Sequence, residues 1–223
     1  MRIPDNLVDQ NISHLNEKER RAHYLNISIQ LRSMLDKRKH EYHAWTSNYS
    51  RLFLDNNIPI EYSISFYEAM IQDCDYKREY DTIEKLEQYM YGSAVVVGFM
   101  MNCILWVRDL RVYEYAKALW EAMQLTNFLR DIKEDKELLE RVYVQDYQIM
   151  DYYHRARNLY RKAELWYHYL PEYARPAISL AWALYEWILD KLEKNNFNIK
   201  KSARTTLFDK LKIIRRWKMI YNL

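Results

Sequence analysis

A polar stripe on one predicted helix carries the residues best suited to hold a metal ion. In the segment 124–135 (QLTNFLRDIKED), Asn127, Asp131 and Asp135 recur every four residues. That spacing places their side chains on one helix face, and Gln124 extends the face by one turn. Neighbouring carboxylates repel one another, and Mg²⁺, which takes oxygen ligands and keeps waters or phosphate oxygens, removes that repulsion.

The same stripe has a simpler interpretation as a solvated acidic face. Basic residues accompany it, namely Arg130, Lys133 and Lys136. For this segment alone the surface interpretation is favoured, because acidic residues four apart are common on exposed helices. A second copy of the pattern, Asp5 and Asp9 with Arg2 three residues before, shifts the balance towards a metal site.

Two such pairs would suit a diphosphate if they faced each other across a helical cavity. Several Mg²⁺ ions held there would neutralise the charge that develops as a carbon–oxygen bond breaks. Long apolar helix faces would enclose a hydrocarbon tail and exclude water. The residues therefore predict the ionisation of an allylic diphosphate to a carbocation.

Several stretches match one set of motifs, in order along the chain. Residues 2–10 (RIPDNLVDQ) match RxxDDIVDE, 80–86 (YDTIEKL) match RYxTFEEL, 90–101 (MYGSAVVVGFMM) match YxxAGTVGLMM, and 124–135 match QLTNILRDVxED. Shorter matches follow at 156–160, 170–171, 184–189 and Arg204. From Arg2 to about Lys212 the chain thus resembles the squalene/phytoene synthase family.

The resemblance implies an all-α isoprenoid synthase fold with a central hydrophobic channel. Such enzymes join two prenyl diphosphates head to head through a cyclopropylcarbinyl diphosphate. The YGSA variant at 91–94 favours, by analogy, geranylgeranyl diphosphate as substrate and phytoene, a carotenoid precursor, as product. The alternative is a squalene or dehydrosqualene synthase that uses farnesyl diphosphate.

The resemblance also implies roles for individual residues. Mg²⁺, with Mn²⁺ as a substitute, would be held by Asp5, Asp9, Asn127, Asp131 and Asp135. Diphosphate oxygens would contact Arg2, Arg130 and Arg204, whose guanidinium forks suit them. The cavity would be lined by Gln124, Tyr91 and Tyr185. The four aspartates and Tyr185 are the catalytic candidates, although Tyr185 suits a packed core helix equally well.

Three features depart from the family pattern. Family members carry further helices before the first motif, so we expect residues 1–223 to form one N-terminally short domain. Trp120 replaces the small glycine of LGxAxQ (119–124), and 140–144 (ERVYV) replaces GRIYLP without its glycine and proline. These departures leave open a non-catalytic member that serves as an assembly factor, although such a protein would not need aligned carboxylates.

The composition predicts the scaffold that positions these residues. Two glycines and four prolines among 223 residues exclude Gly-rich phosphate loops, dinucleotide-binding folds and hairpin arrays. Cys74 and Cys103 are too few for a disulfide scaffold. Apolar residues recur every three or four positions, which predicts about eight helices around the channel. Helices are expected over 1–10, 17–36, from there to 55, 60–75, 82–107 with Thr82 as N-cap, 113–140, 147–169, 171–194 and 205–221.

Two stretches bear on membrane binding. Residues 88–107 are uncharged and long enough to span a bilayer, but we favour a buried central helix. The helix 205–223 is basic and has an apolar stripe of Leu207, Leu211, Ile214, Trp217 and Ile220. We expect this stripe to pack on the bundle, with weak association with an anionic membrane surface as the alternative. Nucleic-acid binding is not expected, because no recognised motif accompanies the charge. No signal peptide is visible, which favours a cytoplasmic protein.

Overall fold

The computed structural model describes residues 2–10, 14–43, 45–75, 79–107, 109–198, 203 and 205–221, apart from the side chains of 216–221. The helices within them are α1 (Arg2–Val8), α2 (Glu17–Glu41), α3 (Asn48–Asp55), α4 (Ile60–Gln72), α5 (Ile83–Met90), α6 (Val96–Ile104), α7 (Val112–Glu134), α8 (Ile149–Ala163), α9 (Arg175–Lys194) and α10 (Leu207–Tyr221). Two π-helical turns, η1 (Tyr91–Val95) and η2 (Asp135–Leu139), and two 3₁₀ turns, η3 (Asp146–Gln148) and η4 (Glu164–Tyr169), adjoin them. The predicted all-α fold is confirmed.

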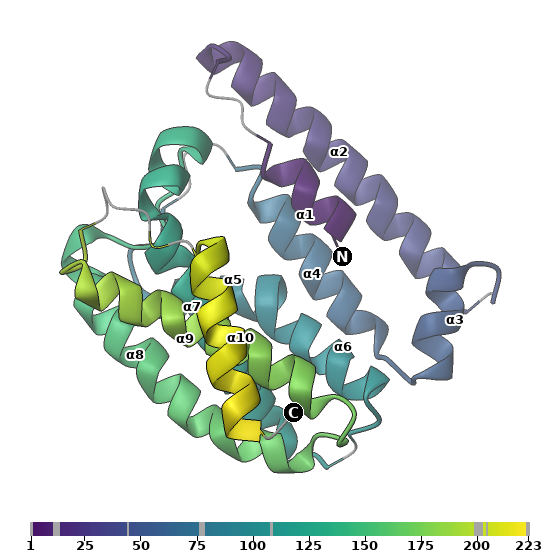
Figure 1. The fold of residues 1–223 in the computed structure, drawn as a ribbon. Helices are drawn as coiled ribbons and strands as arrows, with labels where there is room; N and C mark the ends of the chain where they lie inside the picture. The colour runs from purple at the N-terminus through teal and green to yellow at the C-terminus, as the bar shows by residue number, and fades with distance from the viewer. Residues whose placement is uncertain are drawn as a thin grey trace.

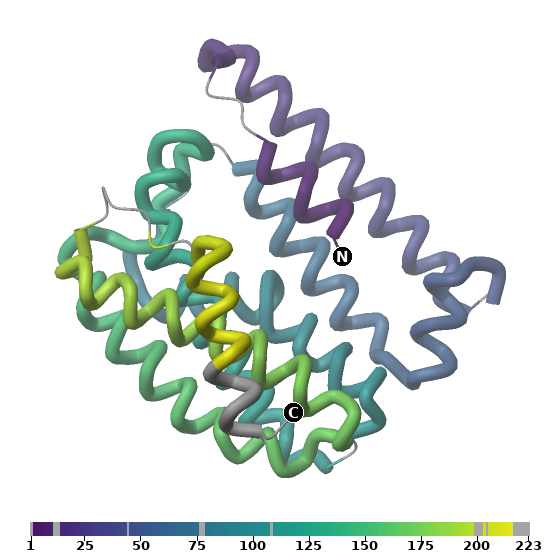
Figure 2. Tube along the Cα trace, viewed as in Figure 1, coloured from purple at the N-terminus to yellow at the C-terminus, as the bar shows by residue number. Residues whose placement is uncertain are grey.

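The helices lie on two sides of a central element. Figure 1 shows α1 alongside α2 and α4, with α7, α8 and α9 on the other side of the molecule. Between them, η1 and α6 contact both α4 and α7. The tube in Figure 2 shows α10 crossing α9, which it contacts. This order places α1 and α7, whose acidic motifs are far apart in the sequence, within reach of one central space.

Helix α2 is longer than the sequence predicted. Asn16 and Glu19 form a reciprocal capping box at its start, and the helix continues through Asp36 to Glu41. The predicted break at Asp36 is wrong, because no glycine or proline interrupts the helix there and its side chain does not stop the hydrogen-bond ladder. The next helix, α3, begins after Ser47, whose side chain caps it.

The predicted helix over 82–107 forms with a defect in its middle. Thr82 is the N-cap, as predicted, and accepts a hydrogen bond from the Lys85 amide at 3.4 Å. The helix then widens into η1 and ends at Ile104. Within η1, a Cβ on Gly92 would lie 2.6 Å from the carbonyl oxygen of Ser65, so only glycine permits this contact with α4.

Other helix ends differ from the prediction by a turn. The helix expected over 113–140 is α-helical to Glu134 and continues through η2 to Leu139. The helix expected from 171 begins at Arg175, with Pro176 in its first turn. The helix expected over 147–169 is α-helical only in α8, because η3 and η4 form its two ends.

The C-terminal helix packs on the bundle mainly through a residue that was not predicted. Ile213 is buried and Ile214 of the predicted stripe is half-buried, whereas Leu207 and Leu211 of that stripe are exposed. The Lys191 ammonium of α9 lies 3.2 Å from Asp209, so an ion pair also joins α10 to α9. The side chains of Trp217 and Ile220 lie outside the described residues. In the described part of the chain, no helix combines the length and apolarity needed to cross a membrane.

Candidate active site

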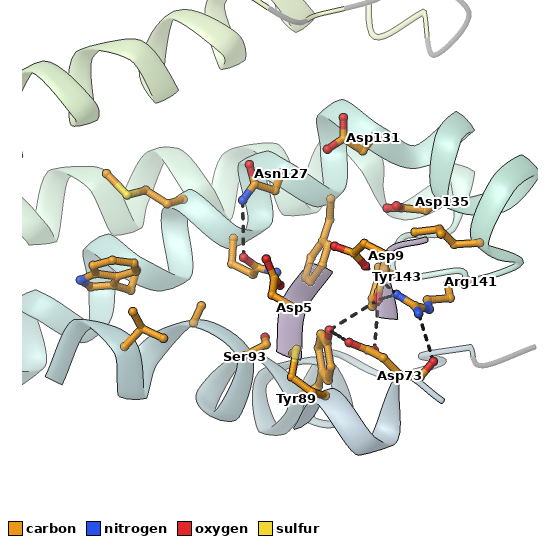
Figure 3. Close-up of a pocket in the computed structure, with 18 of the residues that line it drawn as sticks. Asp5, Asp9, Asp73, Tyr89, Ser93, Asn127, Asp131, Asp135, Arg141 and Tyr143 are labelled. Carbon is orange, nitrogen blue, oxygen red and sulfur yellow. Dashed lines mark hydrogen bonds and ion pairs between the residues drawn. The ribbon is translucent and has the colours of Figure 1, made fainter. Parts of the chain in front are cut away.

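A cavity of about 460 Å³ lies between α1, α4, η1 and α7. Figure 3 shows most of the side chains that line it. The full lining consists of Arg2, Asp5, Asp9, Phe66, Met70, Asp73, Tyr89, Ser93, Ala94, Val97, Trp120, Met123, Gln124, Asn127, Phe128, Arg130, Asp131, Asp135, Leu139, Arg141, Tyr143 and Tyr185. One part of the lining is acidic and the other is apolar, so the cavity suits a ligand with a charged head and a greasy tail.

The two predicted acidic pairs meet in this cavity. Asp5 and Asp9 reach it from α1, and Asp131 reaches it from α7, with Asp135 at the start of η2. Burial raises the pKa of Asp9, and the negative charge of Asp131 raises it further, while Arg141 opposes both effects. The two acidic motifs, more than a hundred residues apart, therefore share one electrostatic environment.

The carboxyl group of Asp135 is strongly perturbed. Burial and then the neighbouring charge of Asp131 raise its pKa to about 8, with a smaller contribution from Asp9. Burial and the charge of Asp9 also raise the pKa of Asp5. Such raised values arise when carboxylates are buried close to one another, and a divalent cation would relieve their repulsion.

The oxygen donors around these carboxylates fit Mg²⁺. The buried Oδ1 of Asn127 accepts no hydrogen bond from any described residue, while its amide nitrogen lies 3.5 Å from Gln124 Oε1. Among the described residues, no group of three or more Asp, Glu, His or Cys side chains is placed to hold a metal ion by itself. Carboxylate and amide oxygens are the donor type that Mg²⁺ takes, together with waters and phosphate oxygens, so Mg²⁺ binding here stays a prediction.

Arg141 joins the two sides of the acidic part of the cavity. Its guanidinium donates to the carbonyl of Val8 at 2.7 Å, to the carbonyl of Asp73 at 3.1 Å and to Asp9 Oδ1 at 3.2 Å. The side chain is buried, and these partners lie at the ends of α1 and α4. Arg141 thus fixes the end of α1 that carries Asp9.

A buried carboxylate supports this arginine. Asp73 accepts hydrogen bonds from the hydroxyls of Tyr89 at 2.7 Å and Tyr143 at 3.3 Å. Burial raises the pKa of Asp73 to about 6, and the positive charge of Arg141 partly offsets the effect. Figure 3 shows this network beside the acidic part of the cavity.

The comparisons with known proteins identify the family. A family model described as squalene/phytoene synthase matches residues 1–144 and 148–211. The chain belongs to this family.

Curated relatives agree with this assignment. The 15-cis-phytoene synthase of Synechocystis sp. is 33% identical over 56% of this chain and 47% of its own length. The 4,4'-diapophytoene synthase of Staphylococcus haemolyticus is 30% identical over 64% and 58%. The phytoene synthase of Cereibacter sphaeroides is 32% identical over 60% and 44%. The chain thus spans about half the length of these relatives.

Solved structures show the fold of the family. A dehydrosqualene synthase in complex with a ligand superposes with a TM-score of 0.73 and 22% identity, over 99% of this chain and 83% of that one. The squalene synthase HpnC of Alicyclobacillus acidocaldarius gives a TM-score of 0.67 and 21% identity, over 87% and 80%. The chain therefore has the all-α isoprenoid synthase fold that the resemblance implied.

The remaining candidate residues of this squalene/phytoene synthase family member divide into three groups. Arg2, Gln124, Arg130 and Tyr185 line the cavity with the acidic residues. Arg130 Nε lies 2.8 Å from Asp131 Oδ1, so the arginine is already paired on its own helix. Tyr91 is 40% exposed and is not among the residues that line the cavity. Arg204 lies outside the described residues.

The sequence interpretation missed the Arg141 network. The segment 140–144 was compared with GRIYLP only for the glycine and proline it lacks, whereas the arginine and tyrosine it keeps, Arg141 and Tyr143, form the network. Asp73, at the end of α4, lies outside all the sequence motifs that were matched to the family. The retained R-x-Y spacing was the one available signal.

The two replaced glycines have different structural consequences. Glu140 stands where the family motif has glycine and adopts a left-handed backbone with φ 54°, while its side chain pairs with Arg20. That conformation disfavours any residue with a Cβ. Trp120 stands at the other glycine position and lines the cavity.

Proposed function

We propose that this chain condenses two prenyl diphosphates head to head. The observation that carries the proposal is the convergence of the acidic residues of α1 and α7 on one cavity whose other part is apolar. The family match and the phytoene, diapophytoene and dehydrosqualene synthases among its relatives support the same reaction class.

The residues of the cavity suit the first ionisation. Mg²⁺, held by Asp5, Asp9, Asn127, Asp131 and Asp135, would neutralise the charge on the leaving diphosphate. Arg2 and Arg130 lie in the same lining and would donate to its oxygens. The apolar lining, including Phe66 and Val97, would keep water from the allylic cation until a carbon–carbon bond forms.

The reaction balances without a redox partner for a phytoene-type product. The carbon–oxygen bond of one substrate breaks, diphosphate leaves, and the double bond of the other substrate attacks the cation with loss of a proton. A second loss of diphosphate and of a proton gives the hydrocarbon. The YGSA variant favours twenty-carbon substrates by analogy, whereas the position of Trp120 in the cavity favours fifteen-carbon substrates.

Product formation tests the proposal directly. The protein is incubated with Mg²⁺ and either farnesyl or geranylgeranyl diphosphate, and released diphosphate and extracted hydrocarbon are measured. A C30 or C40 hydrocarbon, absent when EDTA is added, is the expected result. Failure of both substrates to give any hydrocarbon would overturn the proposal.

A non-catalytic family member is the second candidate. The bulk of Trp120 in the cavity and the backbone of Glu140 favour it. Thermal unfolding with Mg²⁺ and a non-hydrolysable prenyl diphosphate distinguishes the two: the enzyme is stabilised only when both are present, and a scaffold that does not bind them is unaffected.

The exposed face of the C-terminal helix suits binding to a membrane surface, from which prenyl diphosphates could be taken up. Leu207, Phe208 and Leu211 are exposed beside Lys210 and Lys212, which suits weak association with an anionic membrane surface. Co-sedimentation with phosphatidylserine vesicles, with and without residues 205–223, tests it. Equal sedimentation of both forms would refute the association.

A further inference from the structure

Trp120 lies on the same face of α7 as the acidic residues. Trp120, Gln124, Asn127, Asp131 and Asp135 follow one another at intervals of four, three, four and four, and all five line the cavity. At a rise of about 1.5 Å per residue, Trp120 lies about 10 Å along the axis from Asn127 and about 16 Å from Asp131. Distances along this face of α7 therefore measure how far Trp120 lies from the acidic residues.

The indole ring of Trp120 lines the apolar part of the cavity and packs against α6. A Cβ built on Gly98, in the facing helix α6, would lie 2.1 Å from Trp120 Cδ1, so the ring packs directly against the backbone of α6. Val97 and Met123 line the cavity beside the ring. The backbone of α6 behind it prevents the ring from retreating, because cores of this density do not yield without cost.

The polar atom of the ring is not used by the fold. Trp120 Nε1 is buried and donates to no described residue. A buried unpaired donor costs free energy. The half-buried ring therefore faces the cavity as a bulky and largely apolar surface.

We propose that Trp120 limits the hydrocarbon tail of the substrate to about fifteen carbons, so that the enzyme prefers a farnesyl-length over a geranylgeranyl-length diphosphate. This inference rests on the proposed function. An extended isoprene unit contains four carbon–carbon bonds of about 1.5 Å and is about 5 Å long. Three units occupy about 15 Å, close to the axial distance of about 16 Å between Asp131 and Trp120, whereas four would need about 20 Å and would meet the ring.

Binding of a chain-length series tests the limit without relying on turnover. Geranyl, farnesyl and geranylgeranyl thiodiphosphates, which resist ionisation, are titrated calorimetrically into the protein with Mg²⁺. The wild type binds the farnesyl compound about tenfold or more tightly than the geranylgeranyl compound, since one misplaced methylene alone changes discrimination by about tenfold. Trp120→Ala removes this preference by tightening the binding of the longer compound.

Two further variants serve as controls. Trp120→Phe keeps most of the bulk and should keep the preference for the farnesyl compound. Trp187→Ala, on α9 where the ring lies beside Lys194 and outside the cavity lining, should leave all three affinities unchanged. Thermal unfolding of each variant confirms that it is folded.

The outcomes separate the length limit from the proposed reaction. If the wild type binds the longer compound as tightly as the farnesyl compound, or if Trp120→Ala leaves their ratio unchanged, the limit is wrong. If none of the three compounds binds, the limit is wrong as well. If the farnesyl compound binds with the expected cut-off but neither diphosphate substrate turns over, the limit stands and the proposed reaction fails.

Discussion

The two acidic pairs of the cavity are held in place by different means. Asn127, Asp131 and Asp135 belong to a helix of 23 residues and the turn that continues it, whose inner side is buried in the core. Asp5 and Asp9 belong to, or directly follow, a helix of seven residues. A helix that short is marginal in water, so α1 depends on its tertiary contacts.

Arg141 supplies the main polar contact of α1. It reaches the carbonyl of Val8 and the carboxylate of Asp9 from a segment that follows η2. The α7 residues are therefore positioned by local helix geometry, whereas the α1 pair is positioned by a side chain more than 130 residues away. We therefore expect the α7 residues to keep their positions when distant residues are changed, and Asp5 and Asp9 to lose theirs when Arg141 is removed.

Removing the anchor should have the largest effect. Arg141→Met leaves Asp73 buried without its compensating charge, which we expect to cost about 3–5 kcal/mol in the free energy of unfolding. Denaturant unfolding measures it. Arg111→Met, which breaks the exposed pair with Asp109, should leave the free energy of unfolding nearly unchanged. A loss below about 1 kcal/mol for Arg141→Met would show that α1 is held by apolar contacts instead.

Removing one carboxylate from each pair tests whether the two act on one site. Asp9→Asn and Asp131→Asn should each slow diphosphate release by about 10²–10³-fold, because each removes charge that stabilises the leaving group. Asp151→Asn, exposed on α8, is the control and should leave the rate unchanged. If Asp9→Asn alone left the rate unchanged, the α1 pair would lie outside the reacting site.

The pH should have a smaller effect on Mg²⁺ affinity than the carboxylate substitutions have on rate, and Asp135 should determine it. Because its pKa in the folded protein is about 8, the cation must displace a proton below that pH. Affinity for Mg²⁺, measured calorimetrically with an inert diphosphate, should rise up to about tenfold per pH unit between pH 6 and 8 and level off above. Asp135→Asn should weaken binding and flatten this dependence; a steep dependence that persists in the variant would assign it to another group.

The same carboxyl group affects stability in the absence of metal. Its pKa is raised above the ordinary value of 3.8, so the folded state holds a proton that the unfolded chain releases. The resulting stabilisation is complete below about pH 4 and is lost as the pH rises towards about 8. Asp135→Asn should remove this part of the pH dependence of unfolding.

The smallest expected effect concerns the turn that leads into Arg141. Glu140→Gly and Glu140→Ala both lose the pair with Arg20, but only glycine relieves the left-handed backbone. The glycine variant should therefore be more stable than the alanine variant by about 1 kcal/mol in denaturant unfolding. Equal stabilities would mean that the turn relaxes when the side chain is removed.

The sequence by its local patterns predicts helix faces and helix caps. The four-residue spacing of Asn127, Asp131 and Asp135 fixes their common face as soon as a helix forms, because that periodicity belongs to the backbone. The cap at Thr82 was predictable for the same reason, since its hydrogen bond to Lys85 spans three residues. The family motifs predicted the fold, because they mark the helices that carry them.

What the tertiary structure decided depends on contacts between distant segments. Asp73 carries no local signal, and Arg141 reaches its carbonyl only when the ends of α1 and α4 meet. Tyr91 lies in the π-helical turn η1 and is 40% exposed, and Gly92 beside it packs closely against the carbonyl of Ser65 in α4. Side-chain burial and the pKa values that follow from it arise only in the packed state, and so does the ring of Trp120 against Gly98.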